Sequence, residues 1–506
     1  MYLKDPIVFN TNGGNRFLFS PFRKQFILCH PVVQCLFELH QKDADILQFL
    51  DKIKQVGYLD VKDFGRFSQD EVSYHYRKFR FLLSNGYFKP MPLPKMNGRL
   101  NPLKIDDNLK HIRQIILEVT EDCNLSCIYC SYSKFYINEP RSNASLSFTA
   151  ARKMISWVLH QRENDTNQEL IISFYGGEPL KNYALIRRVV QFVDKSNKYG
   201  IHVKYNMTSN GTLVKKYFSF LEQYGFSVTI SLDGDRYANS FRVFRETGKQ
   251  VYDAVLKNIL YIRNTNPEYY EKNISFLAVL HKRNSSEEVH RFFKDEFGKI
   301  PTLTDVSTIN LRPGKRSKFF QTFIDSRKPR ISSMSEAKDM MTFHPEIKGL
   351  SDMLEHTLAF FYRSYLQLAS GKASLHIPRA IIPTATCSPF NIRMFLTVDG
   401  RILPCEHISR SYWIGRLTSG QPEMNIRKIA NSFNSYLEKI SPLCSKCYIS
   451  DACKECMFNI HLKEQPPRCD YFIDKKTWPA FLAWRMSILE RDPTIYPKIM
   501  RKGNDK

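Results

Sequence analysis

Three cysteines stand close together in the first half of the chain, where Cys123, Cys127 and Cys130 form a C-x3-C-x2-C triplet. Three thiolates at this spacing can hold three corners of a 4Fe–4S cluster, and the fourth iron then has no protein ligand. A structural zinc site would instead require four ligands in a closed tetrahedron. The triplet therefore predicts an iron–sulfur cluster that binds a further molecule at its open iron. Zinc, with a fourth ligand from elsewhere, is the alternative.

A second group of cysteines lies near the C-terminal end and has seven members: Cys387, Cys405, Cys444, Cys447, Cys453, Cys456 and Cys469. Two C-x2-C pairs within it could hold one zinc ion, but this alternative leaves three cysteines unused. Closely spaced cysteines in a reducing compartment indicate metal sites rather than disulfides. The remaining Cys29 and Cys35 lie in an apolar stretch and are predicted to be small core residues.

The residues around the triplet alternate between strand-like and helix-like segments, from about 106 to 313. Six such units imply an α/β fold with a parallel sheet, a partial (β/α)6 TIM-like barrel, whose chemistry sits at the carboxyl ends of its strands. The triplet directly follows the first strand, which places it at this mouth. The predicted strands are Ile112–Val119, Leu170–Tyr175, His202–Met207, Ser227–Leu232, Ser275–Leu280 and Asp305–Leu311.

Four other regions flank this barrel. Residues 1–105 combine strands with three short helices and predict a winged-helix-like domain, and the proline-containing stretch 91–107 is predicted to be a linker. Residues 314–386 are predicted to bridge, through a helix at Gly349–Ser370, to a Cys-rich iron–sulfur domain at 387–475. Residues 476–506 are predicted to be a C-terminal tail.

The composition limits the location and the kinds of partner expected for this protein. The 506 residues contain no apolar run of about 18 residues and no signal-peptide pattern, so we expect a cytoplasmic protein without a membrane span. The net charge of +24 favours polyanions or acidic peptides as partners. No helix rich in Lys and Arg with interleaved aromatic residues stands out, which disfavours nucleic acid.

Further motifs follow the other predicted strands, and together with the triplet they resemble the radical S-adenosylmethionine (SAM) enzymes. A Gly-Gly-Glu-Pro element ends the second strand, and its glycines would let the backbone approach a ligand. The resemblance implies that Glu178 accepts from the methionine ammonium, that Tyr129 lies near the adenine and that Arg242 pairs with the cofactor carboxylate. The residues expected to contact SAM are Tyr129, Gly176, Gly177, Glu178, Pro179, Ser209, Asn210, Ser231, Asp233 and Arg242.

The second cysteine group resembles the SPASM extension of these enzymes, which implies two auxiliary 4Fe–4S clusters and three clusters in all. By this resemblance one auxiliary cluster uses Cys387, Cys405 and Cys456, and the other uses Cys444, Cys447, Cys453 and Cys469. The last pair departs from the family pattern, being C-x2-C where relatives more often have C-x3-C. Only three cysteines remain for the first auxiliary cluster, so its fourth ligand is left open.

The resemblance implies an enzyme that forms a 5′-deoxyadenosyl radical and cross-links a ribosomally made (RiPP) precursor peptide through a thioether or carbon–carbon bond. The N-terminal domain would bind the leader of this peptide, and a flavodoxin or ferredoxin would supply electrons. The alternatives are a sulfatase-maturing enzyme, which forms formylglycine, and an RNA-modifying radical enzyme. Sulfatase-maturing relatives carry Asp where this chain has Glu406. No side chain is assigned as a catalytic base.

Overall fold

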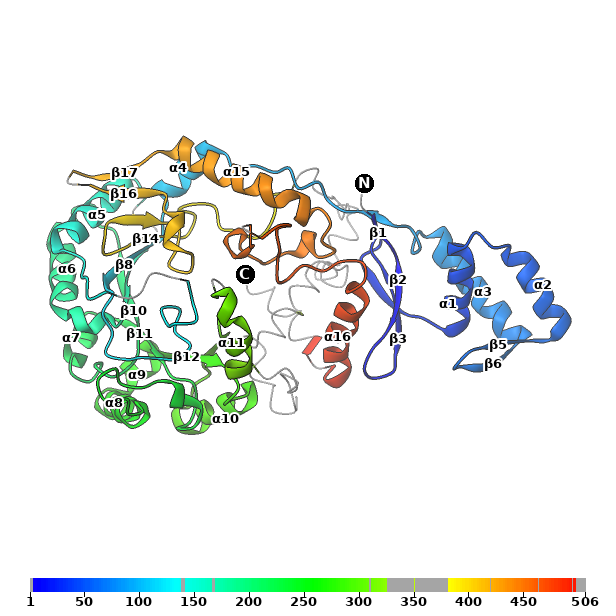
Figure 1. Cartoon of the computed structure of the whole chain (residues 1–506), viewed down its shortest axis with the longest axis horizontal. Coiled ribbons are helices and arrows are strands. Elements are labelled where there is room, and N and C mark those ends of the chain that lie inside the picture. Colours follow the sequence, from blue (N-terminus) through cyan, green and yellow to red (C-terminus); the bar gives the residue numbers. More distant parts are fainter. Residues whose placement is uncertain are drawn as a thin grey trace.

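The computed structural model describes residues 3–137, 142–165, 169–308, 311–324, 350, 381–418, 420–462, 464–493 and 495–496 of the chain. Figure 1 shows an elongated molecule, with a curved sheet and its helices at one end and the N-terminal unit at the other. The Cys-rich segment runs between them. Within the described residues, no helix has the length and apolar character to cross a membrane.

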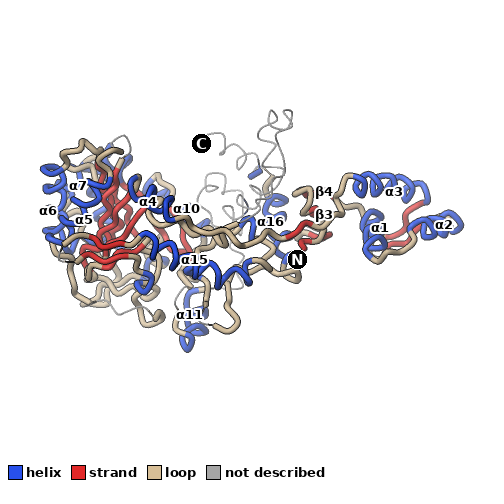
Figure 2. The backbone as a smooth tube through the Cα atoms, turned by 90° about the horizontal axis from the view of Figure 1, so that it is seen from above, coloured by secondary structure: helices blue, strands red, loops and turns tan. Residues whose placement is uncertain are grey.

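A barrel-like sheet forms the centre, and six of its strands are parallel neighbours in chain order. Figure 2 shows helices against the outer face of this sheet. The strands are β8 (Gln114–Thr120), β9 (Leu170–Gly176), β10 (Val203–Ser209), β11 (Ser227–Ser231), β12 (Ile274–Leu280) and β13 (Thr302–Asp305). The helices between them are α5 (Phe148–Gln161), α6 (Tyr183–Ser196), α7 (Phe218–Gln223), α8 (Tyr252–Thr265), α9 (Pro267–Asn273) and α10 (Ser286–Phe297). The predicted α/β fold is confirmed, but the sixth strand begins three residues earlier than predicted and ends at Asp305.

The Cys-rich segment extends the same sheet. Strand β14 (Arg393–Leu396) pairs in parallel with β8, and β15 (Arg401–Leu403), β16 (Gly415–Leu417) and β17 (Pro422–Met424) continue antiparallel. The long helix α15 (Ile426–Cys444) follows. The expected domain boundary at residue 387 is therefore not a break in the sheet, because strands on both sides of it are hydrogen-bonded.

The N-terminal unit contains a three-stranded sheet with the order β2 (Ile7–Asn10), β3 (Arg16–Ser20) and β4 (Gln25–Leu28). Three helices follow it: α1 (Pro31–Gln41), α2 (Ile46–Val56) and α3 (Gln69–Ser84). Between α2 and α3 lies a hairpin of β5 (Tyr58–Val61) and β6 (Gly65–Ser68). The short strand β1 (Leu3–Lys4) pairs with β7 (Met91–Pro92).

The stretch predicted as a linker is partly helical. Helix α4 (Pro102–Lys110) has Pro102 in its first turn, and the Asn101 side chain accepts from the Leu103 amide. Both are normal start signals for a helix, so the prediction of a linker up to residue 107 is wrong. In the bridging region, α11 (Arg316–Phe323) is helical. The helix predicted at 349–370 lies outside the described residues, apart from Leu350.

The C-terminal stretch expected to be a tail contains helix α16 (Trp478–Arg491), which packs on the N-terminal sheet. The Trp478 ring meets Phe19 of β3 edge-on, with ring centroids 5.7 Å apart. At the far end of the helix, Glu490 accepts a hydrogen bond of 2.6 Å from Thr11. One face of the sheet therefore packs on the three N-terminal helices and the other face on α16.

Replacement of Trp478 by Ala tests this packing. The side chain is 4% exposed, so its removal should destabilise the contact between α16 and the N-terminal sheet by about 3–5 kcal/mol. Denaturant unfolding and limited proteolysis near residues 1–100 measure the effect. Trp484→Ala on the same helix is the control, because that side chain is 37% exposed and its loss should change little. Equal losses in both variants would contradict the packing role.

Candidate cofactor cavity and cysteine sites

A cavity of about 850 Å³ opens inside the barrel, where the cysteine loop meets the strand ends. Its size is in the range of small-molecule sites. All three cysteines of the triplet line it. Seven of the ten residues expected to contact SAM line it too: Tyr129, Gly176, Gly177, Ser209, Asn210, Ser231 and Arg242. Glu178, Pro179 and Asp233 are buried beside it and do not line it.

The cysteine loop is fixed by the turn after β9. The amide of Gly177 donates to Thr120 O at 2.8 Å, and the amide of Glu178 donates to Asp122 O at 2.9 Å. A Cβ on Gly176 would lie 2.0 Å from Thr120 O, and one on Gly177 would lie 2.0 Å from Asp122 O. The two glycines are therefore required for contact with the backbone that enters the cysteine loop, whereas the sequence suggested contact with a ligand.

Two donors point at the Cys123 thiol. The Leu125 amide lies 3.4 Å from its Sγ, and the Asn210 side-chain nitrogen lies 3.8 Å away. Asn210 is held in turn by the Asn124 side chain, which accepts at 2.8 Å. Donors of this kind stabilise a thiolate and influence the potential of a cluster bound to it. The arrangement fits an iron ligand at Cys123.

The Glu178 side chain holds two loops together. Its side chain is fully buried and accepts from the Ser209 hydroxyl at 2.9 Å and from the Asn210 amide at 2.7 Å. It also accepts from the Leu180 amide at 3.2 Å and so begins the short turn Pro179–Asn182. The carboxylate therefore joins the turn after β9 to the end of β10, and it does not face the cavity.

A buried charge network lies behind the cysteine loop. Arg242 donates two hydrogen bonds of 3.0 Å to Asp233, whose carboxylate also accepts from the hydroxyl of Tyr129. His281, at the end of β12, lies 3.6 Å from the same carboxylate. Burial opposes the charge on Asp233, but Arg242 and His281 hold the pKa of that carboxyl well below its usual range. Arg242 lines the cavity while it holds Asp233.

Arg410 joins the Cys-rich segment to the cysteine loop and was not anticipated from the sequence. Its guanidinium donates to Glu118 of β8 at 2.5 Å and pairs with Glu121, two residues before Cys123. The hydroxyl of Tyr132, two residues after Cys130, lies 3.4 Å away. No local signal marks Arg410, because its partners are almost 300 residues distant in sequence. His281 could have been found, since it directly follows a predicted strand.

Glu406 and Tyr175 both line the cavity. One oxygen of Glu406 accepts from Arg393 at 2.8 Å and lies 3.2 Å from His407. The other oxygen is buried and has no hydrogen-bond partner within the part of the chain that the structure describes. Glu406 thus presents a polar group from the Cys-rich segment to the same cavity as the triplet.

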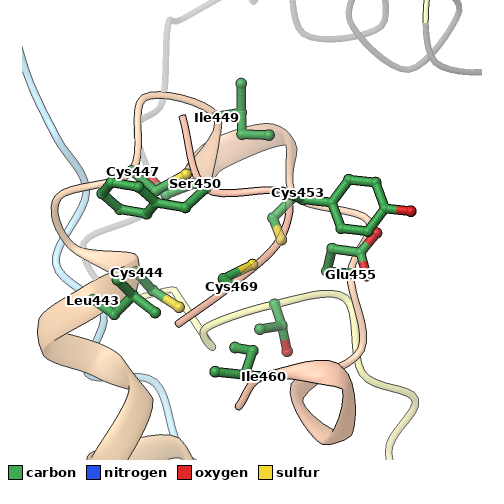
Figure 3. A pocket seen from close by; sticks show the side chains of 12 residues that line it. Leu443, Cys444, Cys447, Ile449, Ser450, Cys453, Glu455, Ile460 and Cys469 are labelled. Atoms are coloured by element: carbon green, nitrogen blue, oxygen red, sulfur yellow. The ribbon is translucent and has the colours of Figure 1, made fainter. Parts of the chain in front are cut away.

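Four cysteines of the second group surround one pocket. Figure 3 shows Cys444, at the end of α15, with Cys447, Cys453 and Cys469 around it. Burial, reinforced by the neighbouring thiols, raises the pKa of Cys444 to about 12. Across the described ranges, no three Cys, His, Asp or Glu side chains converge closely enough to hold a single metal ion. Thiols spread around a common pocket suit a cluster of several irons better than one tetrahedral zinc.

The other three cysteines of that group also approach one another. Burial raises the pKa of Cys405 to about 11, and Cys456 adds to the rise. Cys387 acts in the same direction on Cys456. The Thr386 hydroxyl lies 3.8 Å from the Cys456 sulfur. Cys456 is therefore close enough to Cys405 and to Cys387 for the charges of these thiols to act on one another.

Comparison with known families decides the class of the barrel. The family described as "Radical SAM superfamily" matches residues 117–295, which include the triplet and the strands that line the cavity. Residues 117–295 form a radical SAM domain. The family implies a 4Fe–4S cluster and SAM as cofactors, and the triplet, its donors and the cavity are a fitting donor set for both.

Relatives of this chain include a sulfatase-maturating enzyme and a cyclopropyl synthase. The "Cysteine-type anaerobic sulfatase-maturating enzyme" of Clostridium novyi (strain NT) is 26% identical over 318 residues, which are 61% of this chain and 77% of that enzyme. The "Radical SAM cyclopropyl synthase TigE" of Paramaledivibacter caminithermalis is 23% identical over 314 residues, 59% of this chain and 62% of that enzyme. A solved structure, "Native anSMEcpe with bound AdoMet and Cp18Cys peptide", is 18% identical with a TM-score of 0.47, covering 78% of this chain and 99% of that one.

Replacement of Gly177 by Ala tests how the cysteine loop is fixed. The new Cβ cannot share space with Asp122 O, so the loop should shift, and the variant should lose the triplet's iron and most of its SAM affinity. Iron analysis and calorimetric SAM binding measure this, and circular dichroism confirms that the protein is folded. Gly314→Ala is the control, because no atom lies within 4 Å of its added Cβ. Full iron content and SAM affinity in the Gly177 variant would contradict the assignment.

Proposed function

We propose that this protein is a peptide maturase, a radical SAM enzyme that oxidatively cross-links a ribosomally made precursor peptide through a thioether or carbon–carbon bond. The observation that carries the proposal is a free strand edge on an N-terminal unit that is packed directly against the Cys-rich segment. Lys4 of β1 is buried and forms an ion pair of 3.2 Å with Asp451. In the sequence, Asp451 stands between two of the cysteines of Figure 3. The names of the relatives agree with a peptide substrate.

Three clusters are part of this proposal. The triplet would hold the cluster that binds SAM, and the two separate cysteine groups would hold two auxiliary clusters. When bound, the cluster and SAM supply a 5′-deoxyadenosyl radical that removes a hydrogen atom from an unactivated carbon. Forming a thioether from a C–H and an S–H group also releases one proton and one electron. The auxiliary clusters would accept that electron, and a flavodoxin or ferredoxin would supply the first one.

The chain's own residues position these groups. Asn210 and the Leu125 amide donate to the Cys123 sulfur, and the hydroxyl of Tyr129 is anchored on Asp233 at the cavity wall. Arg410 holds the segment that carries Cys405 and Glu406 against the cysteine loop. The cavity is therefore closed on one side by the triplet and on another by the Cys-rich segment, which keeps a reactive site away from bulk water.

The N-terminal unit would bind the leader of the peptide at β4. In the described part of the chain, β4 is an edge strand whose only partner is β3. The Cys29 amide donates to Arg16 of β3, so the preceding amide of Leu28 points to the free edge because successive amides alternate in a strand. The side chain of Leu28 is 62% exposed. An extended peptide can add to such an edge as a further strand.

Helix α3 supplies charge near this edge. Tyr74, Arg77, Lys78 and Phe81 are exposed at helical spacing, so aromatic and basic side chains alternate on one face. Burial raises the pKa of the Cys29 thiol to about 11, and Lys78 is close enough to this thiol to oppose the rise. This surface suits an acidic leader with apolar anchors, in keeping with the net charge of +24.

A sulfatase-maturing enzyme is the second candidate, because the named relatives of Clostridium carry out that role. Such an enzyme oxidises a single Cys or Ser of its substrate and forms no cross-link. Mass spectrometry separates the two after incubation with candidate precursor peptides that contain Cys and, separately, with a sulfatase peptide that contains Cys. A cross-link lowers the mass by two hydrogens and joins two residues in the fragment spectrum. Formylglycine in a sulfatase peptide, without any cross-link, would refute the proposal.

Replacement of Cys127 by Ala tests the role of the triplet. The variant should form no 5′-deoxyadenosine and should lose about one third of the bound iron, if three clusters of equal size are present. Chromatography of 5′-deoxyadenosine and iron analysis are the measurements. Cys35→Ala, which changes a cysteine outside both groups, should leave both quantities unchanged. Continued 5′-deoxyadenosine formation by the Cys127 variant would refute the central assignment.

Replacement of Leu28 by Pro tests the strand edge. Proline removes the amide that faces the free edge and leaves the pairing of β4 with β3 intact, so peptide affinity should fall at least tenfold. Leu28→Ala is the matched control, because it removes the side chain and keeps the amide. Fluorescence anisotropy with the labelled peptide measures affinity. If the two variants bind equally well, the peptide does not add to β4.

A further inference from the structure

The inner wall of the barrel is polar below the cysteine loop. Side chains alternate between the two faces of a strand, and the outward positions, such as Ile115, Ile172 and Val228, are buried in the core. The inward positions are different. At one level of the inner wall each of the six strands carries a hydroxyl or amide side chain that lines the 850 Å³ cavity: Gln114, Ser173, Asn206, Thr229, Ser275 and Thr302. We call these six residues the lumen ring. Apolar side chains such as Ile116, Leu277 and Val279 line the cavity at other levels.

Such a ring is unusual for the inside of a barrel. Closed barrels of parallel strands fill their interior with bulky branched side chains, which form a dry core. Hydroxyl and amide groups without partners would each cost about 1–3 kcal/mol in a dry interior. A lumen with this lining is therefore built to contain water or a polar ligand.

Part of the hydrogen-bonding capacity of the ring is used within it. Gln114 donates to Ser173 at 2.6 Å, and the hydroxyls of Thr229 and Ser275 are 2.9 Å apart. Asn206 lies beside Ser173 in the strand register, and its side chain makes no hydrogen bond to any described residue. Its carboxamide keeps a donor and an acceptor for a ligand.

The depth of the ring separates it from the residues expected to contact SAM. Asn206 precedes Ser209 by three residues, and Ser173 precedes Gly176 by three, which in a strand corresponds to about 10 Å. Both levels nevertheless belong to one cavity. A ligand held by the ring is therefore within the space that the cysteine loop also faces.

We propose that the lumen ring binds a neutral hydroxyl or carboxamide side chain of the substrate peptide, next to the residue that is modified. The ring itself has no charged member, so a Lys, Arg, Asp or Glu side chain would find no ion-pair partner within it, whereas a hydroxyl or carboxamide would find both donors and acceptors. The inference rests on the proposed peptide substrate. It adds a specificity site that holds the peptide inside the barrel.

The test uses Asn206→Leu and Thr229→Val, which keep side-chain shape and remove hydrogen bonds. Each should raise the KM for a precursor peptide that the wild-type enzyme modifies roughly three- to tenfold. The dissociation constant for SAM should stay within about twofold, because the ring would contact the peptide. Thr322→Val on the surface of α11 is the matched control and should change neither quantity. Unchanged KM values for both ring variants would overturn the inference.

A second arm identifies the group that the ring binds. Copies of the peptide in which each Ser, Thr, Asn or Gln is replaced by Ala are assayed with the wild-type enzyme and with Asn206→Leu. One position should raise the wild-type KM and have no further effect in the variant, as a double-mutant cycle requires. Failure to find such a position would overturn the inference. Weaker SAM binding in parallel with the rise in KM would overturn it too. If the wild-type enzyme cleaves SAM but modifies no peptide, the proposed function itself fails and this inference fails with it.

Discussion

The position of the cysteine triplet depends on one contact between two pieces of backbone, the turn after β9 and the loop after β8. They lie so close that neither Gly176 nor Gly177 has room for a Cβ. Glu178, in the same turn, accepts a hydrogen bond from the Asn210 amide at the end of β10. The Asn210 side chain in turn donates to the sulfur of Cys123. The chain thus closes a ring of hydrogen bonds through three neighbouring strands. The cysteine loop has little helix or strand structure of its own, and this ring supplies the rigidity it lacks.

Buried charges connect this mouth to the rest of the molecule. Arg410 reaches Glu118 and Glu121 from the Cys-rich segment, and Arg242 holds Asp233 behind the loop. Removing one member of a buried ion pair leaves an uncompensated charge and destabilises strongly, whereas replacing both can be neutral. The pairs are therefore better understood as devices for placement than as sources of stability. Their geometry fixes the Cys405 segment against the triplet, so Glu406 of that segment faces the same cavity as the triplet.

Local patterns made part of this structure predictable from the sequence. The N-terminal unit contains three helices as its pattern indicated, and the triplet follows β8 as the order of strands required. Long-range contacts were not predictable, because nothing near Arg410 reveals a partner far away in the chain. The error at β13 has a different cause. Its inward Thr302 and Thr304 face the lumen, so the true strand looks polar. The stretch that follows it, up to Leu311, contains more apolar residues and therefore resembles a strand more closely.

That error points to how the barrel divides its two faces. Parallel strands buried on both sides are nearly continuous runs of apolar residues, whereas β10 and β11 alternate as if one side were solvated. The apolar outer positions pack in the main core beneath the helices, so much of the stability of the barrel comes from that face. On the inner face, apolar residues such as Ile116, which packs with Phe395, share the wall with the polar lumen ring. Because the ring residues belong to none of the apolar clusters, they can be matched to a substrate with little loss of stability.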